Sequence, residues 1–289
     1  MRDLHDVQAM LEKVGIPGQD AYDLPDSPKR FPDGTHYRME ISGVERPQVL
    51  EALIDEMEKR EIPIHRLIST VMGSTLLDDA ELKDFAQMAA DADLEVIITP
   101  GPRSGWDVGR QLVTPEGGLS GLRYRGSDQL TYVIAEYLRC IDLGFRGFLC
   151  IDEGLLWVVN QLKQTGDIPE DVVFKVSIYA GHASAAGGKV LESLGASTFN
   201  PLGDLTLPEL ASIRQAVDIP LDLHIMLSES FGGFNRFYEG AEMARVCSPC
   251  YFKIEPGPAL AAGAGAWYKP WTSPDMLAWQ AREKVKYAQ

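Results

Sequence analysis

The sequence predicts an α/β protein of the (β/α)8 TIM barrel class, on three observations. Short apolar runs typical of strands alternate with longer helix-like segments along most of the 289 residues. Strands separated by helices pair in parallel through right-handed crossovers, and about eight such units close most naturally into a barrel. Several strands also alternate polar with apolar residues, as expected where one face lines a barrel and the other packs on helices.

The expected strands are runs of apolar or alternating character, bounded by glycine, proline or polar turn residues. In chain order they lie at residues 36–42, 64–70, 94–99, 147–152, 173–178, 196–200, 220–225 and 251–255. Alternation places Asp222 and His224 on one face of the seventh strand, and Lys253 and Glu255 on one face of the eighth.

Helices are expected between these strands, and three of their starts carry recognisable signals. Pro47 suits the first turn of a helix. Asp78 followed by Glu81, and Thr206 followed by Glu209, have the spacing of capping boxes. The expected helices are at residues 3–14, from 47 onward, 78–92, 128–143, 154–164, 183–194, 206–217, 236–246 and from about 274.

This pattern divides the chain into two regions, an N-terminal extension and the barrel. Residues 1–34 form an N-terminal extension, with one helix and then a stretch rich in proline, glycine and aspartate. Residues 35–289 form the barrel, including a Gly/Ala-rich loop at 257–265 and the last helix. Barrels of about 250 residues commonly form a single domain, so one hydrophobic core is expected.

The composition narrows the class of function. The chain is 45% hydrophobic and 24% charged, which is typical of a globular protein. Its net charge of −15 argues against nucleic-acid binding, which needs a basic surface. We find no apolar run of about 18 residues for a membrane span and no secretion leader, so we expect a cytoplasmic protein. Cys140 and Cys150 are expected to be small buried hydrophobes.

The polar faces of the strands predict a functional cavity. If the strands share one sheet whose apolar face is covered by helices, the other face collects many ionisable groups. Burying each costs several kcal/mol unless it is paired, metal-bound or hydrated. The residues on this face are His36, Arg38, Glu40, Lys175, Ser177, Asp222, His224, Lys253 and Glu255.

Three of these residues predict a metal site. In a closed barrel the first, seventh and eighth strands are neighbours, so Glu40, His224 and Glu255 are expected to converge. One imidazole and two carboxylates suit Mn, Fe(II) or Zn, with Asp222 orienting the histidine. A metal-free acid–base site with the same residues is equally compatible with the sequence. In a third interpretation Glu40, Arg38, Lys253 and Glu255 simply neutralise one another.

Other candidates lie at the ends of the strands. Lys175 and Lys253 are candidates for imine chemistry or, more simply, for pairing with a carboxylate. Asp152 ends the fourth strand, where it suits an acid or base and equally a helix cap. Ser177 and Asn200 end their strands and are expected to hydrogen-bond a substrate, although Asn200 followed by Pro201 also suits the start of a turn.

The long loop after the third strand carries an excess of arginine. Arginine recognises carboxylates and phosphates through two parallel hydrogen bonds. Arg103 and Arg123 are therefore the expected contacts to an anionic substrate. A subunit contact or a solvated loop is the alternative.

Several segments resemble the U32 peptidase family. Residues 191–201 (LESLGASTFNP), 205–214 (LTLPELASIR) and 217–224 (VDIPLDLH) are similar to the family's helix ending in LGA, its strand, its LSLEEI and its DIPLEV. Residues 137–156 are similar to the family's strand before a D-x-G-x-L turn. The resemblance covers about residues 78–227 and implies a barrel.

One departure from that family bears on cofactors. Its members usually carry the first of four cysteines after the seventh strand, and in several of them the set ligates an iron–sulfur cluster. Residues 226–236 hold no cysteine, and only Cys247 and Cys250 follow. Four thiolates normally hold such clusters, so no iron–sulfur cluster is expected.

We therefore expect a barrel enzyme that acts on a small anionic or hydroxylated metabolite by acid–base chemistry, with or without a divalent metal. Hydrolase, lyase and isomerase outcomes are not separated by the sequence. Two alternatives stay open: a U32-type peptidase acting on peptides, and a non-catalytic ligand-binding or scaffold barrel. The oligomeric state is also open, a homo-oligomer included.

Overall fold

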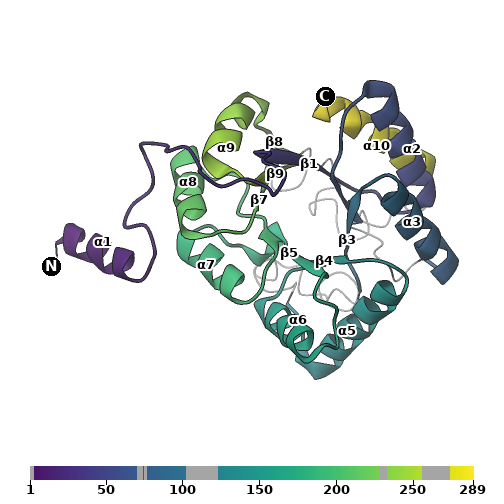
Figure 1. Cartoon of the computed structure of the whole chain (residues 1–289), viewed down its shortest axis with the longest axis horizontal. Coiled ribbons are helices and arrows are strands. Elements are labelled where there is room, and N and C mark those ends of the chain that lie inside the picture. Colours follow the sequence, from purple (N-terminus) through teal and green to yellow (C-terminus); the bar gives the residue numbers. More distant parts are fainter. Residues whose placement is uncertain (1–2, 70–73, 75–76, 102–122, 228–232, 256–273) are drawn as a thin grey trace.

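The computed structural model describes residues 3–69, 74, 77–101, 123–227, 233–255 and 274–289. In Figure 1 these residues form a ring of strands surrounded by helices. The strand order is β6-β5-β4-β3-β2-β1-β9-β7-β8, and β6 also pairs with β7, which closes the ring. The predicted (β/α)8 barrel is confirmed.

Eight strands of the ring are parallel to their neighbours, and each overlaps its predicted range. They are β1 (Tyr37–Ser42), β2 (Arg66–Ser69), β3 (Glu95–Ile98), β4 (Gly147–Cys150), β5 (Val173–Val176), β6 (Thr198–Phe199), β7 (Leu221–Leu227) and β9 (Cys250–Glu255). An additional short strand, β8 (Phe234–Asn235), pairs antiparallel with β7 and was not predicted.

The helices form the outer layer of the ring. They are α2 (Pro47–Arg60), α3 (Asp79–Asp91), α5 (Gly126–Asp142), α6 (Glu153–Thr165), α7 (Ala185–Ser193), α8 (Leu207–Ala216), α9 (Gly240–Cys247) and α10 (Pro274–Ala288). Short 3-10 turns, η3 (Ile178–Ala180) and η5 (Phe237–Glu239), precede α7 and α9. Capping boxes start α3 and α8, as predicted. None of the helices in the described ranges has the length and apolarity of a membrane span.

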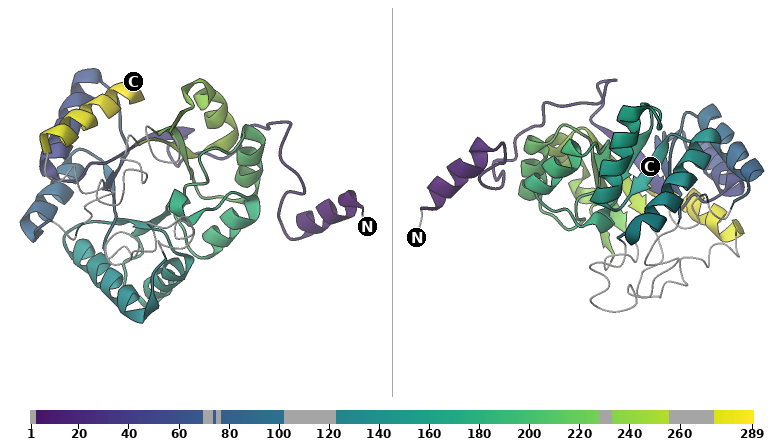
Figure 2. Two further views of the ribbon diagram at one scale, coloured as in Figure 1. Left: turned by 180° about the vertical axis from the view of Figure 1, so that it is seen from behind. Right: turned by 90° about the horizontal axis from the view of Figure 1, so that it is seen from below.

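The N-terminal extension begins with α1 (Leu4–Lys13), which buries none of its side chains and stands away from the barrel in Figures 1 and 2. The segment after α1 is attached to the barrel: the Ala21 amide donates to the Pro208 carbonyl at 3.2 Å, and the Ser27 amide donates to the Arg245 carbonyl at 3.0 Å. Phe31 is buried at the end of this segment.

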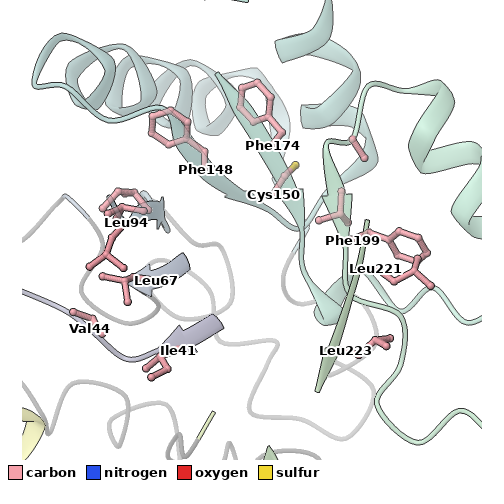
Figure 3. Packing of buried hydrophobic residues seen from close by; sticks show 14 of the residues in the cluster. Ile41, Val44, Leu67, Leu94, Phe148, Cys150, Phe174, Phe199, Leu221 and Leu223 are labelled. Atoms are coloured by element: carbon pink, nitrogen blue, oxygen red, sulfur yellow. The ribbon is translucent and has the colours of Figure 1, made fainter. Parts of the chain in front are cut away.

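The hydrophobic core lies between the strands and the helices. Figure 3 shows apolar side chains on the strands, among them Phe148 on β4 and Phe174 on β5. Tyr137 of α5 packs on both rings, with centroids 4.7 Å from Phe148 and 5.7 Å from Phe174. The outward faces of the strands are therefore apolar, which leaves the inward faces for polar residues.

The strand register stacks the inward side chains in layers. In a (β/α)8 barrel each layer takes about four side chains from alternate strands. Because the strands are tilted, residues at the same height on neighbouring strands are offset by about one residue from the paired register. Applied to the observed pairings, this rule gives four successive layers from the N-terminal end of the strands upward. The first layer is Arg66, Gly147, Thr198 and Tyr251, and the second, here called the charged layer, is Glu40, Ile97, Lys175 and Asp222. The third layer is Ile68, Leu149, Asn200 and Lys253. The fourth, here called the mouth layer, is Ser42, Thr99, Ser177 and His224.

Candidate active site inside the barrel

Two carboxylates and two cations meet in the lower half of the barrel. Lys175 Nζ lies 2.6 Å from Asp222 Oδ2 and 3.2 Å from Glu40 Oε2. The Arg66 guanidinium reaches up from the layer beneath and binds the same two carboxylates through Nη2 and Nε. Thr198 Oγ1 donates to Asp222 Oδ2 at 2.7 Å. All five side chains are buried, and the two negative charges are balanced by two positive ones.

The ionisation of this cluster follows from its mutual contacts. Burial opposes the charge on Arg66, but Asp222 and Glu40 outweigh it and raise the pKa of the guanidinium. Burial and the Arg66 charge lower the pKa of Lys175 to about 8, although Asp222 and Glu40 offset part of the effect. Burial acts to raise the pKa of Asp222, yet Arg66 and Lys175 together lower it. Arg66, Lys175 and Asp222 are therefore charged at neutral pH.

Aromatic side chains close the barrel beneath this cluster. The Arg66 guanidinium lies 3.4 Å from the centroid of the Tyr251 ring. Phe31 of the N-terminal extension packs edge-on against Tyr251, with centroids 5.2 Å apart, and Arg38 lies over Phe31 at 4.4 Å. Arg38 also pairs with Asp33 at 2.8 Å. The extension thus covers the N-terminal end of the barrel.

A histidine and a carboxylate lie near the opposite end. His224 Nε2 on β7 is 3.0 Å from Glu255 Oε2 on the neighbouring β9. Lys253 Nζ is 2.7 Å from the same oxygen. The side chain of His224 is fully covered, whereas that of Glu255 keeps 11% of its surface exposed. The pair is therefore buried on the histidine side and nearer to solvent on the glutamate side.

The surroundings of this pair make His224 a neutral base. Burial acts to raise the pKa of Glu255, but Lys253 and His224 outweigh it and hold that pKa well below its usual range. Burial and the Lys253 charge lower the pKa of His224. A neutral imidazole facing a carboxylate carries its hydrogen on the facing nitrogen, so Nε2 donates to Glu255 and Nδ1 keeps a lone pair. In the described part of the chain that Nδ1 atom is buried without a hydrogen-bond partner.

The predicted metal ligands do not form one set. Glu40 lies in the charged layer, where Arg66 and Lys175 bind it, whereas His224 and Glu255 pair near the other end. Within the described ranges no group of three His, Cys, Asp or Glu side chains has a geometry that could hold a metal ion. The carboxylates contact cationic side chains of the chain itself, so these residues do not fit a divalent metal.

The structure gives three strand-end residues mainly local contacts. Asp152 accepts from the Leu155 amide and caps α6, which is the second of its two predicted roles. Ser177 accepts from the Tyr179 amide at 3.3 Å and caps η3. Asn200 Nδ2 donates to the Asp222 carbonyl at 2.6 Å, so its other amide atom, Oδ1, stays available.

The predicted anion-binding arginines are placed differently. Arg103 lies outside the described residues. The Arg123 guanidinium binds Glu153 and also donates to the Ile151 carbonyl at 3.2 Å. His182 Nε2 lies 2.7 Å from the other Glu153 oxygen. Arg123 thus joins the ends of β4 and β5 through a carboxylate of its own chain.

Two residues predicted on the polar inner face lie elsewhere. His36 is exposed at the start of β1. Arg38 pairs with Asp33 at the N-terminal end of the barrel and does not neutralise Glu40. The expected contact of Arg38 was wrong because the N-terminal extension, whose course the sequence does not specify, supplies its partners Asp33 and Phe31.

The most important inward residue that sequence reasoning missed is Arg66. Its strand reads His65-Arg66-Leu67-Ile68, so polar residues fall on both faces and the alternation is unclear. Lys284 of α10 was also missed, because a lysine near the end of a helix normally faces solvent. Its Nζ is buried and donates to the Ser42 carbonyl at 2.5 Å. Burial lowers its pKa to about 8, with Glu45 and Glu255 as the nearest charges opposing that effect.

A separate cavity of about 280 Å³ lies among the described residues at the N-terminal side of β3 to β5. It is lined by residues of α3, of the start of β3, and of the loops that precede β4 and β5. None of the charged-layer or mouth-layer residues lines it. Barrel enzymes work at the C-terminal ends of their strands, so this cavity is not the candidate site.

Comparison with known proteins supports the fold. No protein-family model matches the chain, and no curated protein does. A solved D-psicose 3-epimerase with D-tagatose from Clostridium cellulolyticum H10 is 11% identical, with a TM-score of 0.51, and the match covers 87% of this chain and 98% of that one. The U32 peptidase Mk0906 is 17% identical, with a TM-score of 0.47 and coverage of 80% and 97%. A 2,3-dimethylmalate lyase is 14% identical, with a TM-score of 0.45 and coverage of 88% and 94%.

Identities this low establish the architecture alone. The chain is a (β/α)8 barrel with a charged interior. The U32 peptidase is one of several barrel enzymes with comparable similarity, so family membership is not assigned.

Proposed function

We propose that this barrel is an enzyme that removes a proton from a small metabolite, with His224 as the general base. The observation that carries the proposal is the state of this side chain: Nε2 is held by Glu255 at 3.0 Å, and the buried Nδ1 has no partner among the described residues. A base oriented through one ring nitrogen presents its other nitrogen to a substrate.

Glu255 has the role of orienting and stabilising the base. When His224 accepts a proton, the adjacent carboxylate stabilises the imidazolium that forms. The ion pair with Lys253 at 2.7 Å holds Glu255 in its charged form throughout. Lys253 also supplies positive charge where a substrate oxygen gains electron density after losing its proton.

The charged layer has a supporting role in this proposal. Glu40, Lys175 and Asp222 are closed among themselves and Arg66, so their contacts fix the spacing of β1, β5 and β7. Lys175 is buried between two carboxylates two layers beneath His224, a position that favours ion pairing over imine formation with a substrate. We therefore assign the chemistry to the His224 layer and above, and rigidity to the layers beneath.

Proton abstraction places the reaction among isomerases and lyases more readily than among hydrolases. These reactions begin with loss of a C–H or O–H proton next to a carbonyl or hydroxyl group, and one neutral imidazole performs that step. The net charge of −15 supports a small-molecule substrate over a nucleic acid.

Isotope exchange tests this function across several classes of substrate at once. The full chain is incubated in deuterated water with pools of aldoses, ketoses, hydroxy acids and keto acids. Mass spectrometry then detects deuterium uptake or conversion of any compound. The proposal expects exchange with the wild type, at least 100-fold slower exchange with His224→Gln, and full exchange with His65→Gln as a matched control. Equal exchange by wild type and His224→Gln would contradict it.

A further inference from the structure

The mouth layer is made entirely of small hydrogen-bonding groups. Register places Ser42, Thr99, Ser177 and His224 at one level, on β1, β3, β5 and β7 or directly beyond their ends. All four are buried. A buried layer of three hydroxyls and an imidazole gains nothing from apolar packing, so its composition points to recognition of a polar ligand.

The hydrogen-bonding capacity left in this region is mostly that of acceptors. Asn200 uses one hydrogen of its amide NH2 in the bond to the Asp222 carbonyl at 2.6 Å, and its carbonyl Oδ1 is an acceptor without a partner among the described residues. His224 in its neutral form offers the lone pair of Nδ1. Both atoms, together with Thr99 Oγ1, are buried without a partner among the described residues. A hydroxyl can donate or accept, so two of these three groups require a donor from the ligand.

The lysines nearby already have partners: Lys284 donates to the Ser42 carbonyl at 2.5 Å, and the two strand lysines are matched by carboxylates. Lys253 pairs with Glu255, and Lys175 lies between Glu40 and Asp222. An anionic ligand that paired with either strand lysine would have to displace one of these carboxylates from its partner. A neutral ligand with several hydroxyl groups needs no such exchange, and it supplies the donors that the acceptors lack.

We propose that the mouth layer binds a neutral polyhydroxylated compound, with Thr99 and Asn200 as substrate-binding residues. This inference rests on the proposed function, since the same ligand presents its proton to His224. It narrows the substrate class from anionic or hydroxylated compounds to polyols and sugars. Thr99 Oγ1 and Asn200 Oδ1 each receive a hydroxyl of the ligand, and His224 Nδ1 receives the hydroxyl or carbon proton that is transferred.

Binding measurements with defined probes test this inference. Isothermal titration and thermal shift compare erythritol, D-ribose and D-fructose with succinate and inorganic phosphate. We expect at least one of the three neutral compounds to bind, and Thr99→Val to weaken its binding about three- to tenfold, the value of one hydrogen bond. Thr131→Val, on the exposed side of α5, is the matched control and should bind as the wild type does.

The outcomes separate this inference from the proposed function. Binding of phosphate or succinate with none of the neutral compounds would overturn it, and so would unchanged affinity in Thr99→Val. If a polyol binds but no compound undergoes exchange, the ligand class stands and the catalytic proposal fails. If exchange occurs only with compounds that lack hydroxyl groups, the catalytic proposal stands and the ligand class fails.

Discussion

Glu40 and Asp222, on two strands that are not adjacent in the ring, bind the same guanidinium group, that of Arg66. Lys175 lies between the same two carboxylates. This arrangement makes each of the four charges depend on the other three. It explains how the barrel buries so much charge, and it separates a structural cluster from the His224 pair above it.

Removing one member of this cluster should be costly. Lys175→Met leaves two carboxylates facing one guanidinium, and loss of one partner of a buried ion pair costs about 3 to 5 kcal/mol. Denaturant unfolding measures the change. Arg146→Met is the control, since its pair with Asp171 is exposed and worth about 0 to 1 kcal/mol. A loss below about 1 kcal/mol in Lys175→Met would show that the cluster does not hold the barrel together.

A second substitution should reduce that cost. Glu40→Gln removes the negative charge that Lys175→Met leaves unmatched, so the double variant should be more stable than the sum of the two single changes predicts. A coupling of about 1 to 3 kcal/mol is expected from a double-mutant cycle. Strict additivity would mean that Glu40 and Lys175 do not interact in solution.

Lys284 should make stability depend on pH in the alkaline range. Its pKa is about 8 in the folded chain, below the usual value of about 10.4, so the unfolded chain binds more protons between these values. The free energy of unfolding due to this group therefore rises as pH increases from about 8. Buried cysteines act in the opposite sense from about pH 8.5, where unfolded thiols lose their protons, because burial raises their pKa values in the folded chain.

The comparison of two variants isolates this contribution. Between about pH 7.5 and 9, Lys284→Met should lower the wild-type slope of the unfolding free energy against pH. Lys286→Met should keep it, because Lys286 lies exposed on the same helix. Parallel slopes in all three proteins would contradict the buried position of Lys284.

The cysteines should be unreactive in the folded protein. All four are free and buried, and burial raises the pKa of Cys150 to about 12, so little thiolate forms at neutral pH. A thiol reagent such as dithiobis(nitrobenzoate) should modify none of them in native protein and all four after unfolding. Rapid reaction of any thiol under native conditions would show that its site is open.

The fold could be predicted from sequence because local patterns specify it. Alternation in the run Asp222 to Ile225, and the capping box at Asp78, depend only on neighbouring residues. The structure shows both, with Leu223 and Ile225 in the hydrophobic core and the two polar residues facing inward. The closeness of His224 and Glu255 was also predicted from sequence, because adjacent strands of a closed barrel bring their ends together.

The parts that could not be predicted depend on long-range geometry. Which carboxylate binds which cation is set by register and shear. Glu40 lies two layers below His224, where it binds Arg66 and Lys175 and not the predicted metal site. The position of Lys284 depends on how α10 packs, beside α2 in Figure 1. Strand alternation alone carries no information on either.

The protonation of His224 is the most direct test of its role as the base. Nitrogen-15 NMR of histidine-labelled protein, assigned with His224→Gln, reports which ring nitrogen carries hydrogen. At neutral pH we expect an uncharged ring with hydrogen on Nε2 and none on Nδ1. An imidazolium at that pH, or hydrogen on Nδ1, would contradict the assignment of His224 as the base.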